Sequence, residues 1–194
     1  MNKVTRIIIG VLSTSLVILS MMAFAPHSHQ AAAHTKATWG ATWAFTPKSL
    51  AEARGRATNI VIAKVTDVRQ ADDIVVEAPG EPEGVDRIPT QRITFEVVRS
   101  LKGDSSPTLT LFHTGTDDKW IEGDPPYLVG ETYLLFVEPK ADEAGTYLVI
   151  APEGRYRIVK GKVDPMVDHG FAGAMRGKDL AQVEREIGKA HAEK

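Results

Sequence analysis

Three histidines are the side chains of this sequence with the clearest capacity to hold a metal ion: His34, His113 and His169. If the chain is cut after Ala33, His34 becomes the first residue and offers its α-amino group together with its imidazole. Such a pair, completed by the imidazole of His113 or His169, suits copper. A copper-binding or redox protein is therefore one hypothesis. The competing interpretation is that these are packed or loop histidines, and that no cofactor is bound.

No motif specific for catalysis is present in the sequence. It lacks the G-x-S-x-G of acyl transfer, the H-E-x-x-H of zinc enzymes and any glycine-rich phosphate loop. The absence of cysteine removes thiolate metal sites, cysteine nucleophiles and disulfides together. We therefore expect no catalytic residues and a non-enzymatic protein.

Four aromatic residues are the candidate contacts for a partner. Trp39 and Trp43 lie in a leader, and Trp120 and Tyr127 lie in a long acidic connection further along the chain. Large rings are rarely left in water, so we interpret them first as side chains that dock onto the domain. The alternative is an exposed aromatic surface that contacts a protein or a component of the cell envelope.

The N-terminus has the layout of a secretory signal peptide. Lys3 and Arg6 precede an uncharged stretch at 7–25, and Ala31-Ala32-Ala33 offers small residues for cleavage. We predict a signal peptide at 1–33 and an exported protein. Because about 20 apolar residues can span a bilayer, an uncleaved anchor at 7–25 is the alternative. The chain would then be a membrane-anchored accessory subunit.

The charge balance argues against a nucleic-acid partner. The formal net charge is −2, and 25% of the residues are charged. Proteins that bind nucleic acids normally present a basic face. A mildly acidic chain is compatible with a neutral ligand or a protein partner.

The pattern of apolar residues predicts a mainly β domain at 49–165, preceded by the leader at 34–48 and followed by a loop and helix at 166–194. Ser49 and Glu52 match a capping box, which indicates a short helix. Alternating or apolar runs then predict six strands, at 59–68, 92–101, 107–112, 131–138, 146–151 and 155–163. The acidic, Pro/Gly-rich stretch at 70–90 is expected to be a long mobile loop with at most a short edge strand.

The strands follow one another without intervening helices, so we expect antiparallel pairs. Closing five or six of them into a small barrel would remove exposed edges. A closed antiparallel barrel of the OB type is therefore the predicted fold, and a sandwich is the second choice.

Two further predictions concern polar residues within strands. His113 has the parity of Leu109 and Leu111, so we expect it to be packed at the inward end of its strand. Arg155 and Arg157 flank Tyr156, a pattern also seen where strands bind oligonucleotides. We interpret them as two solvent-facing arginines on either side of a core tyrosine.

Two motifs carry a resemblance to a known group. They are F-x-V-x-x-x-L-K-G at 95–103 and G-E-x-Y-L-L-F at 130–136. With the order of strands over 49–163, they resemble exported bacterial proteins whose OB barrel is similar to tissue-inhibitor-of-metalloproteinases and netrin modules. The resemblance implies a rigid exported module that presents loops and an N-terminal segment to a partner. The animal inhibitors act through an N-terminal cysteine, which this chain lacks, so their mechanism does not transfer.

Overall fold

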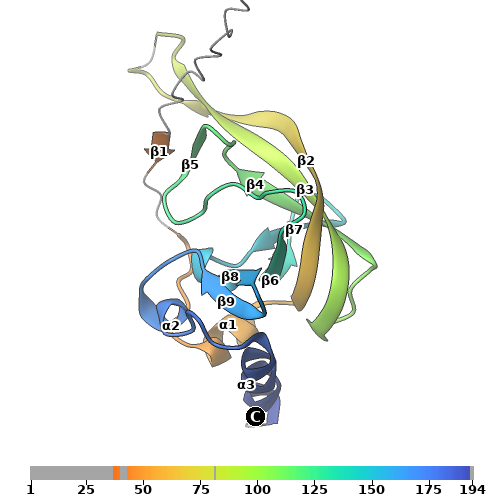
Figure 1. Cartoon of the computed structure of the whole chain (residues 1–194). Helices are drawn as coiled ribbons and strands as arrows, with labels where there is room; N and C mark the ends of the chain where they lie inside the picture. Colours follow the sequence, from red (N-terminus) through yellow and green to blue (C-terminus); the bar gives the residue numbers. More distant parts are fainter. Residues whose placement is uncertain (1–36, 40–42, 81, 193–194) are drawn as a thin grey trace, which may run out of the picture. The chain divides into compact units, whose positions relative to one another are not determined.

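The structure is a computed structural model that describes residues 37–39, 43–80 and 82–192. The predicted signal peptide, the alternative anchor and His34 lie outside the described residues. The elements follow in this order (Figure 1): β1 (Ala37–Trp39), α1 (Leu50–Arg56), β2 (Asn59–Glu77), β3 (Val85–Lys102), β4 (Thr108–Thr114), β5 (Lys119–Ile121), β6 (Thr132–Pro139), β7 (Thr146–Val149), the 3₁₀ turn η1 (Pro152–Gly154), β8 (Arg155–Val159), β9 (Lys162–Pro165), α2 (Gly170–Gly173) and α3 (Leu180–Ala192).

The main sheet confirms the prediction of a mainly β protein. It has seven strands in the order β2-β3-β4-β7-β6-β8-β9, and β2 also pairs with β6. This additional pairing closes a ring through β2, β3, β4, β7 and β6. The remaining strands, β8 and β9, continue the sheet outward from β6.

One pairing in the ring corrects the expectation of a wholly antiparallel sheet. β4 and β7 run parallel, with Thr110 opposite Thr146 and Leu111 opposite Tyr147. The reason is geometric, because an odd number of strands cannot alternate in direction all the way around a closed ring. The other four joints are antiparallel, so the fifth has to be parallel.

The predicted mobile loop at 70–90 is wrong. β2 and β3 continue through it as a long hairpin, and their pairing extends to Glu77 opposite Val85. Only residues 78–84 form the turn, closed by a hydrogen bond from the Ala78 amide to the Gly84 carbonyl. Local composition indicated a loop, but cross-strand pairs such as Ile74 with Ile88 stabilise the ribbon.

The single strand predicted at 155–163 is a hairpin. Lys160 and Gly161 both have positive φ, at 51° and 75°, which is the geometry of the tight turns that suit twisted strands. β8 therefore ends at Val159, and the chain turns back as β9. The loop expected after it contains the short helix α2.

Two predicted helices are confirmed. At the start of α1, the Ser49 hydroxyl accepts a hydrogen bond from the Glu52 amide at 3.2 Å, and the Glu52 carboxylate accepts one from the Lys48 amide at 2.8 Å. The helix predicted within 166–194 is α3, in which Val183 and Ile187 are buried. The helices lie beside β8 and β9 at one end of the ring, as Figure 1 shows.

The strands β2 and β6 separate two apolar clusters, because both of their faces are covered. The inner core lies within the ring and contains Val61, Ala63, Val65, Ile93, Phe95, Leu109, Leu111, Tyr127, Tyr133, Leu135 and Val137. The outer core lies between the other face and the helices and contains Ala53, Ala57, Ile60, Ile62, Leu134, Phe136, Ile150, Tyr156, Val163, Val167, Ala172, Met175, Val183 and Ile187. Burial on two faces explains why β6 is apolar at nearly every position.

Candidate functional site

His113 is buried at the end of β4, which confirms its predicted inward orientation. Its Nε2 lies 3.2 Å from the backbone oxygen of Asp124 and 3.4 Å from the carboxylate oxygen Oδ2 of the same residue. Two oxygen neighbours identify Nε2 as the nitrogen that carries the proton. The other ring nitrogen, Nδ1, is buried and has no hydrogen-bond partner among the described residues.

Arg155 is fully buried, so the prediction of a solvent-facing arginine is wrong. Its Nη1 donates to Oδ1 of Asp124 at 2.9 Å and to the carbonyl oxygen of Pro125, and its Nη2 donates to the carbonyl oxygen of Pro126 at 3.1 Å. The connection between β5 and β6 therefore folds over the first residue of β8. Arg157, two residues further on, is 39% exposed as predicted.

Two tyrosine rings complete the surroundings of Arg155. The guanidinium carbon lies 3.4 Å from the centre of the Tyr127 ring and 4.9 Å from that of Tyr133. Aromatic faces attract cations, most strongly where water is excluded. His113, Asp124 and Arg155, together with these rings, form what we call the buried network.

Electrostatics keep Asp124 and Arg155 charged. Burial on its own would raise the pKa of Asp124, but attraction to His113 and Arg155 and their hydrogen bonds outweigh it, so the pKa is lowered from 3.8. Burial disfavours the charged form of Arg155, yet Tyr127 and Asp124 hold its pKa above the ordinary value. Burial also raises the pKa of Tyr127 well above the usual range, which keeps its hydroxyl protonated.

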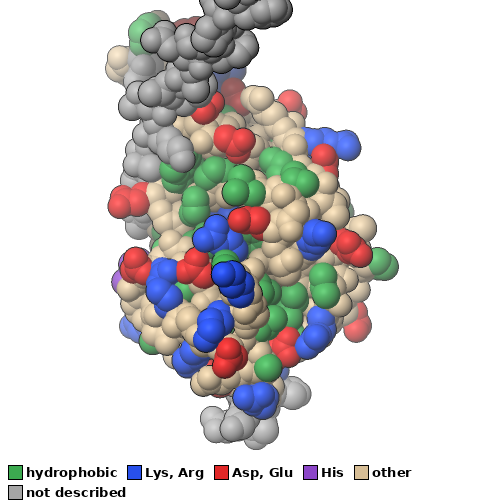
Figure 2. Space-filling view, in the orientation of Figure 1, with side chains coloured by type: hydrophobic (Ala, Val, Ile, Leu, Met, Phe, Trp, Pro, Cys, Tyr) green, Lys and Arg blue, Asp and Glu red, His purple; other side chains and the backbone are tan. Residues whose placement is uncertain are grey.

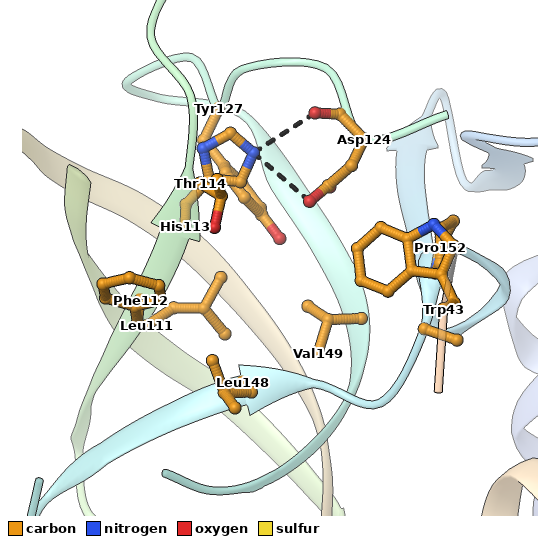
Figure 3. Close-up of a pocket in the computed structure, with 11 residues that line it drawn as sticks. Trp43, Leu111, Phe112, His113, Thr114, Asp124, Tyr127, Leu148, Val149 and Pro152 are labelled. Carbon is orange, nitrogen blue, oxygen red and sulfur yellow. Dashed lines mark hydrogen bonds and ion pairs between the residues drawn. The ribbon is translucent and has the colours of Figure 1, made fainter. Parts of the chain in front are cut away.

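A small pocket of about 80 Å³ lies against this network (Figure 3). We call it the first pocket. Its polar residues are His113, Thr114, Asp124 and Tyr127, and the Tyr127 hydroxyl has no hydrogen-bond partner among the described residues. The rest of the lining is apolar: Trp43, Leu111, Phe112, Leu148, Val149, Ala151 and Pro152. All of these except Ala151 are labelled in Figure 3.

The structure brings only some of the predicted aromatic contacts to this pocket. Trp43 and Tyr127 line it, and Tyr127 is buried. Trp39 ends β1, which pairs in parallel with β5 opposite Ile121. Trp120 lies within β5 and is half-buried. The leader is therefore joined to the connection that carries Asp124 and Tyr127.

The three candidate metal ligands are not assembled into a site in the part of the chain that the structure describes. His113 is engaged by Asp124, whereas the His169 side chain is 72% exposed and faces Glu153 at 3.7 Å. Among the described residues, no group of three histidine, aspartate or glutamate side chains could hold a metal ion. Since His34 lies outside these residues, the copper hypothesis stays a prediction.

Sequence reasoning missed Asp124 and Arg155 as a pair. Asp124 is one of several acids in a long acidic connection, and Arg155 is 31 residues away along the chain. Buried arginines are rare, so single-residue statistics favour the surface. The available signal was weak: Arg155 begins a strand directly after a turn, where a covering loop could reach it.

The geometry of the buried network bears on two roles, proton transfer and the positioning of a loop. A His–Asp pair can orient an imidazole as a general base. Here the Asp124 carboxylate is shared with the buried Arg155, and Nδ1 of His113, the nitrogen that would act as the base, is buried without a hydrogen-bond partner among the described residues. The network is suited to holding the connection between β5 and β6 rigidly beneath the first pocket.

Comparison with known proteins finds no matching family model and no matching characterised protein. The resemblance to inhibitor and netrin modules therefore remains an expectation. Within residues 37–39, 43–80 and 82–192, no helix is both long enough and apolar enough to cross a membrane.

Proposed function

We propose that the chain is an exported, non-enzymatic binding module of the bacterial cell envelope, built on a small OB-like barrel. The ring supports the fold part of this proposal. Numbered along the chain, its strands stand in the order first, second, third, fifth, fourth, and the third and fifth are parallel. This order and the parallel pair support a five-stranded Greek-key barrel of the OB type.

The single observation that carries the binding role is the position of Trp43. This indole lines the first pocket over a base made rigid by the buried network. Pockets that bind ligands are mostly apolar, with a few fixed polar groups. The first pocket fits this description, since Tyr127 supplies an unpartnered hydroxyl among apolar walls.

The connection between β5 and β6 enlarges the proposed contact surface. Its residues Leu128 and Val129 follow the buried Tyr127 and are 52% and 64% exposed. Exposed apolar side chains beside polar ones are typical of surfaces that meet a protein partner. On the face shown in Figure 2, lysine and arginine side chains are interspersed with aspartate and glutamate, which does not favour nucleic acid.

Site-specific photo-crosslinking in the native host tests this proposal. A photoreactive amino acid at position 43 should give one reproducible adduct with an envelope component. The matched control places the same group at Glu96, an exposed residue of β3. Identical adduct patterns from both positions, or none from position 43, would contradict a binding role for this face.

N-terminal sequencing of the protein from its host tests the location. A start between residues 26 and 39 supports export with cleavage. Retention of residues 7–25 would instead favour the membrane-anchored subunit.

A further inference from the structure

A second pocket also has Trp43 in its lining. It has a volume of about 470 Å³ and shares Trp43 and Pro152 with the first pocket. Figure 3 shows these two residues side by side. The leader, the β5–β6 connection, η1 and the β9–α2 loop contribute its lining: Trp43, Thr46, Glu122, Gly123, Pro152, Glu153, Met166, Val167, Asp168 and His169.

The carboxylates of this pocket are not balanced by lysine or arginine in its described lining. Among the described residues, its lining contains three carboxylates, from Glu122, Glu153 and Asp168, and no lysine or arginine. Asp168 is paired with Arg176, which lies outside the lining. Glu122 is exposed, so its carboxylate is available at the rim.

Glu153 is the residue that points to a ligand. It is 3% exposed, and its Oε2 accepts no hydrogen bond from any described residue. The other oxygen has a weak neighbour, the Nδ1 atom of the exposed His169 imidazole at 3.7 Å. A buried carboxylate without a full partner is costly, so a cation that reaches it is strongly favoured.

We infer that this second pocket binds the guanidinium group of an arginine side chain on a partner protein. The inference rests on the binding function proposed above and gives it a chemical class. A planar guanidinium stacks on an indole such as Trp43 and meets carboxylates in a bidentate manner. The volume lies in the range of pockets for small groups, roughly 300–1,000 Å³. Glu153 would lie at its base and Glu122 at its rim.

Titration with N-acetyl-L-argininamide, followed by the NMR signals of the indole N–H groups, tests the inference. The sequence contains three tryptophans, so Trp43 can be followed separately, with Trp120 as an internal control. We expect a saturable shift of the Trp43 signal at millimolar probe concentrations, as befits one small group. The neutral isostere N-acetyl-L-citrullinamide should bind at least about tenfold more weakly.

Three variants sharpen the test. Glu153→Gln keeps the size of the side chain and removes its charge, and should weaken binding at least about tenfold. Trp43→Leu removes the stacking wall without altering charge, and calorimetry replaces the lost indole signal. Glu96→Gln, a change of the same kind on exposed β3, should leave binding unchanged. If Glu153→Gln fails to fold, Trp43→Leu and the citrulline analogue still decide the matter.

Several outcomes would overturn the inference. The Trp43 signal could stay unmoved at about 50 mM probe, a concentration that reveals even very weak binding. Citrulline or lysine analogues could bind as well as arginine, which would exclude a guanidinium-specific site. A specific adduct from position 43 without arginine binding would refute only this inference. Absence of that adduct would refute the proposed function itself.

Discussion

The two cores of this protein are built on different principles, although the same strands separate them. The outer core is a continuous apolar contact between strands and helices, with Val183 and Ile187 of α3 fully buried. The inner core has a buried ion pair between Asp124 and Arg155 at its edge. This difference shows that burial of apolar side chains stabilises the packing of the helices. The ion pair between Asp124 and Arg155 instead stabilises the β5–β6 connection beside the first pocket.

Replacing Arg155 should have the largest effect. Arg155→Met leaves Asp124 buried without its main counter-charge, so we expect a loss of about 4 kcal/mol in the free energy of unfolding. Urea denaturation measures it. Arg157→Met, on the same strand but partly exposed, should cost about 1 kcal/mol or less. If Arg155→Met and Arg157→Met lost the same free energy of unfolding, the buried ion pair would contribute no more than an exposed one.

A cavity in the outer core should cost slightly less. Ile187→Ala removes a buried side chain of α3 and should lower the free energy of unfolding by about 3 kcal/mol. Ile187→Val, which removes one methylene, should cost about 1 kcal/mol. A loss close to zero for Ile187→Ala would mean that α3 contributes little to the outer core.

The response to pH should separate the two cores. Asp124→Asn should cost about 2 kcal/mol at pH 7, because it removes the charge that Arg155 and His113 meet. The folded pKa of Asp124 is lowered from 3.8, so its stabilisation is present above that value and is lost as the pH falls through the folded pKa.

The difference in the free energy of unfolding between wild type and Asp124→Asn should therefore shrink as the pH falls below about 4. The difference caused by Ile187→Ala should stay constant over the same range, as expected of an apolar contact. Denaturant titrations at several pH values measure both. If the loss of unfolding free energy in Asp124→Asn were independent of pH, Asp124 would not stabilise the fold through its negative charge.

The smallest expected effect concerns the cap of α1, which supports the outer core from its edge. Ser49→Ala removes the acceptor for the Glu52 amide and should cost about 1 kcal/mol. Ser106→Ala, in an exposed loop, serves as the control. Thermal unfolding of the two variants gives the comparison, and equal midpoints would show that the cap is dispensable.

Local patterns were sufficient to predict the elements whose cause is local. Ser49 and Glu52 cap α1 through neighbouring groups, and Gly103, in the turn between β3 and β4, has φ +74°. A Cβ atom there would lie 2.7 Å from the carbonyl oxygen of Thr58. Both the positive φ and this close approach therefore require glycine. His113 was also placed correctly, because strand parity is a property of adjacent residues.

The wrong predictions concern residues whose contacts lie far away in the sequence. The parity rule placed Arg155 outside because Tyr156 is in the core, but it assumes that only one face of a strand is covered. At the start of β8 both faces are covered, one by the connection that carries Asp124. The hairpin at 70–90 was missed for a similar reason, since its pairs join residues across a turn that composition alone describes as loop.

The closed ring has a consequence for the order of events in folding. β2, β3 and β4 are neighbours in sequence and can associate early as a meander. The ring closes only when Asn59 meets Val137 and Leu111 meets Tyr147. Such non-local contacts slow folding, because chain entropy is lost before they form. Until residue 139 has left the ribosome the outer edge of β2 has no strand beside it, and the outer edge of β4 has none until residue 149 has left. The growing chain is open to pairing with its neighbours during this time.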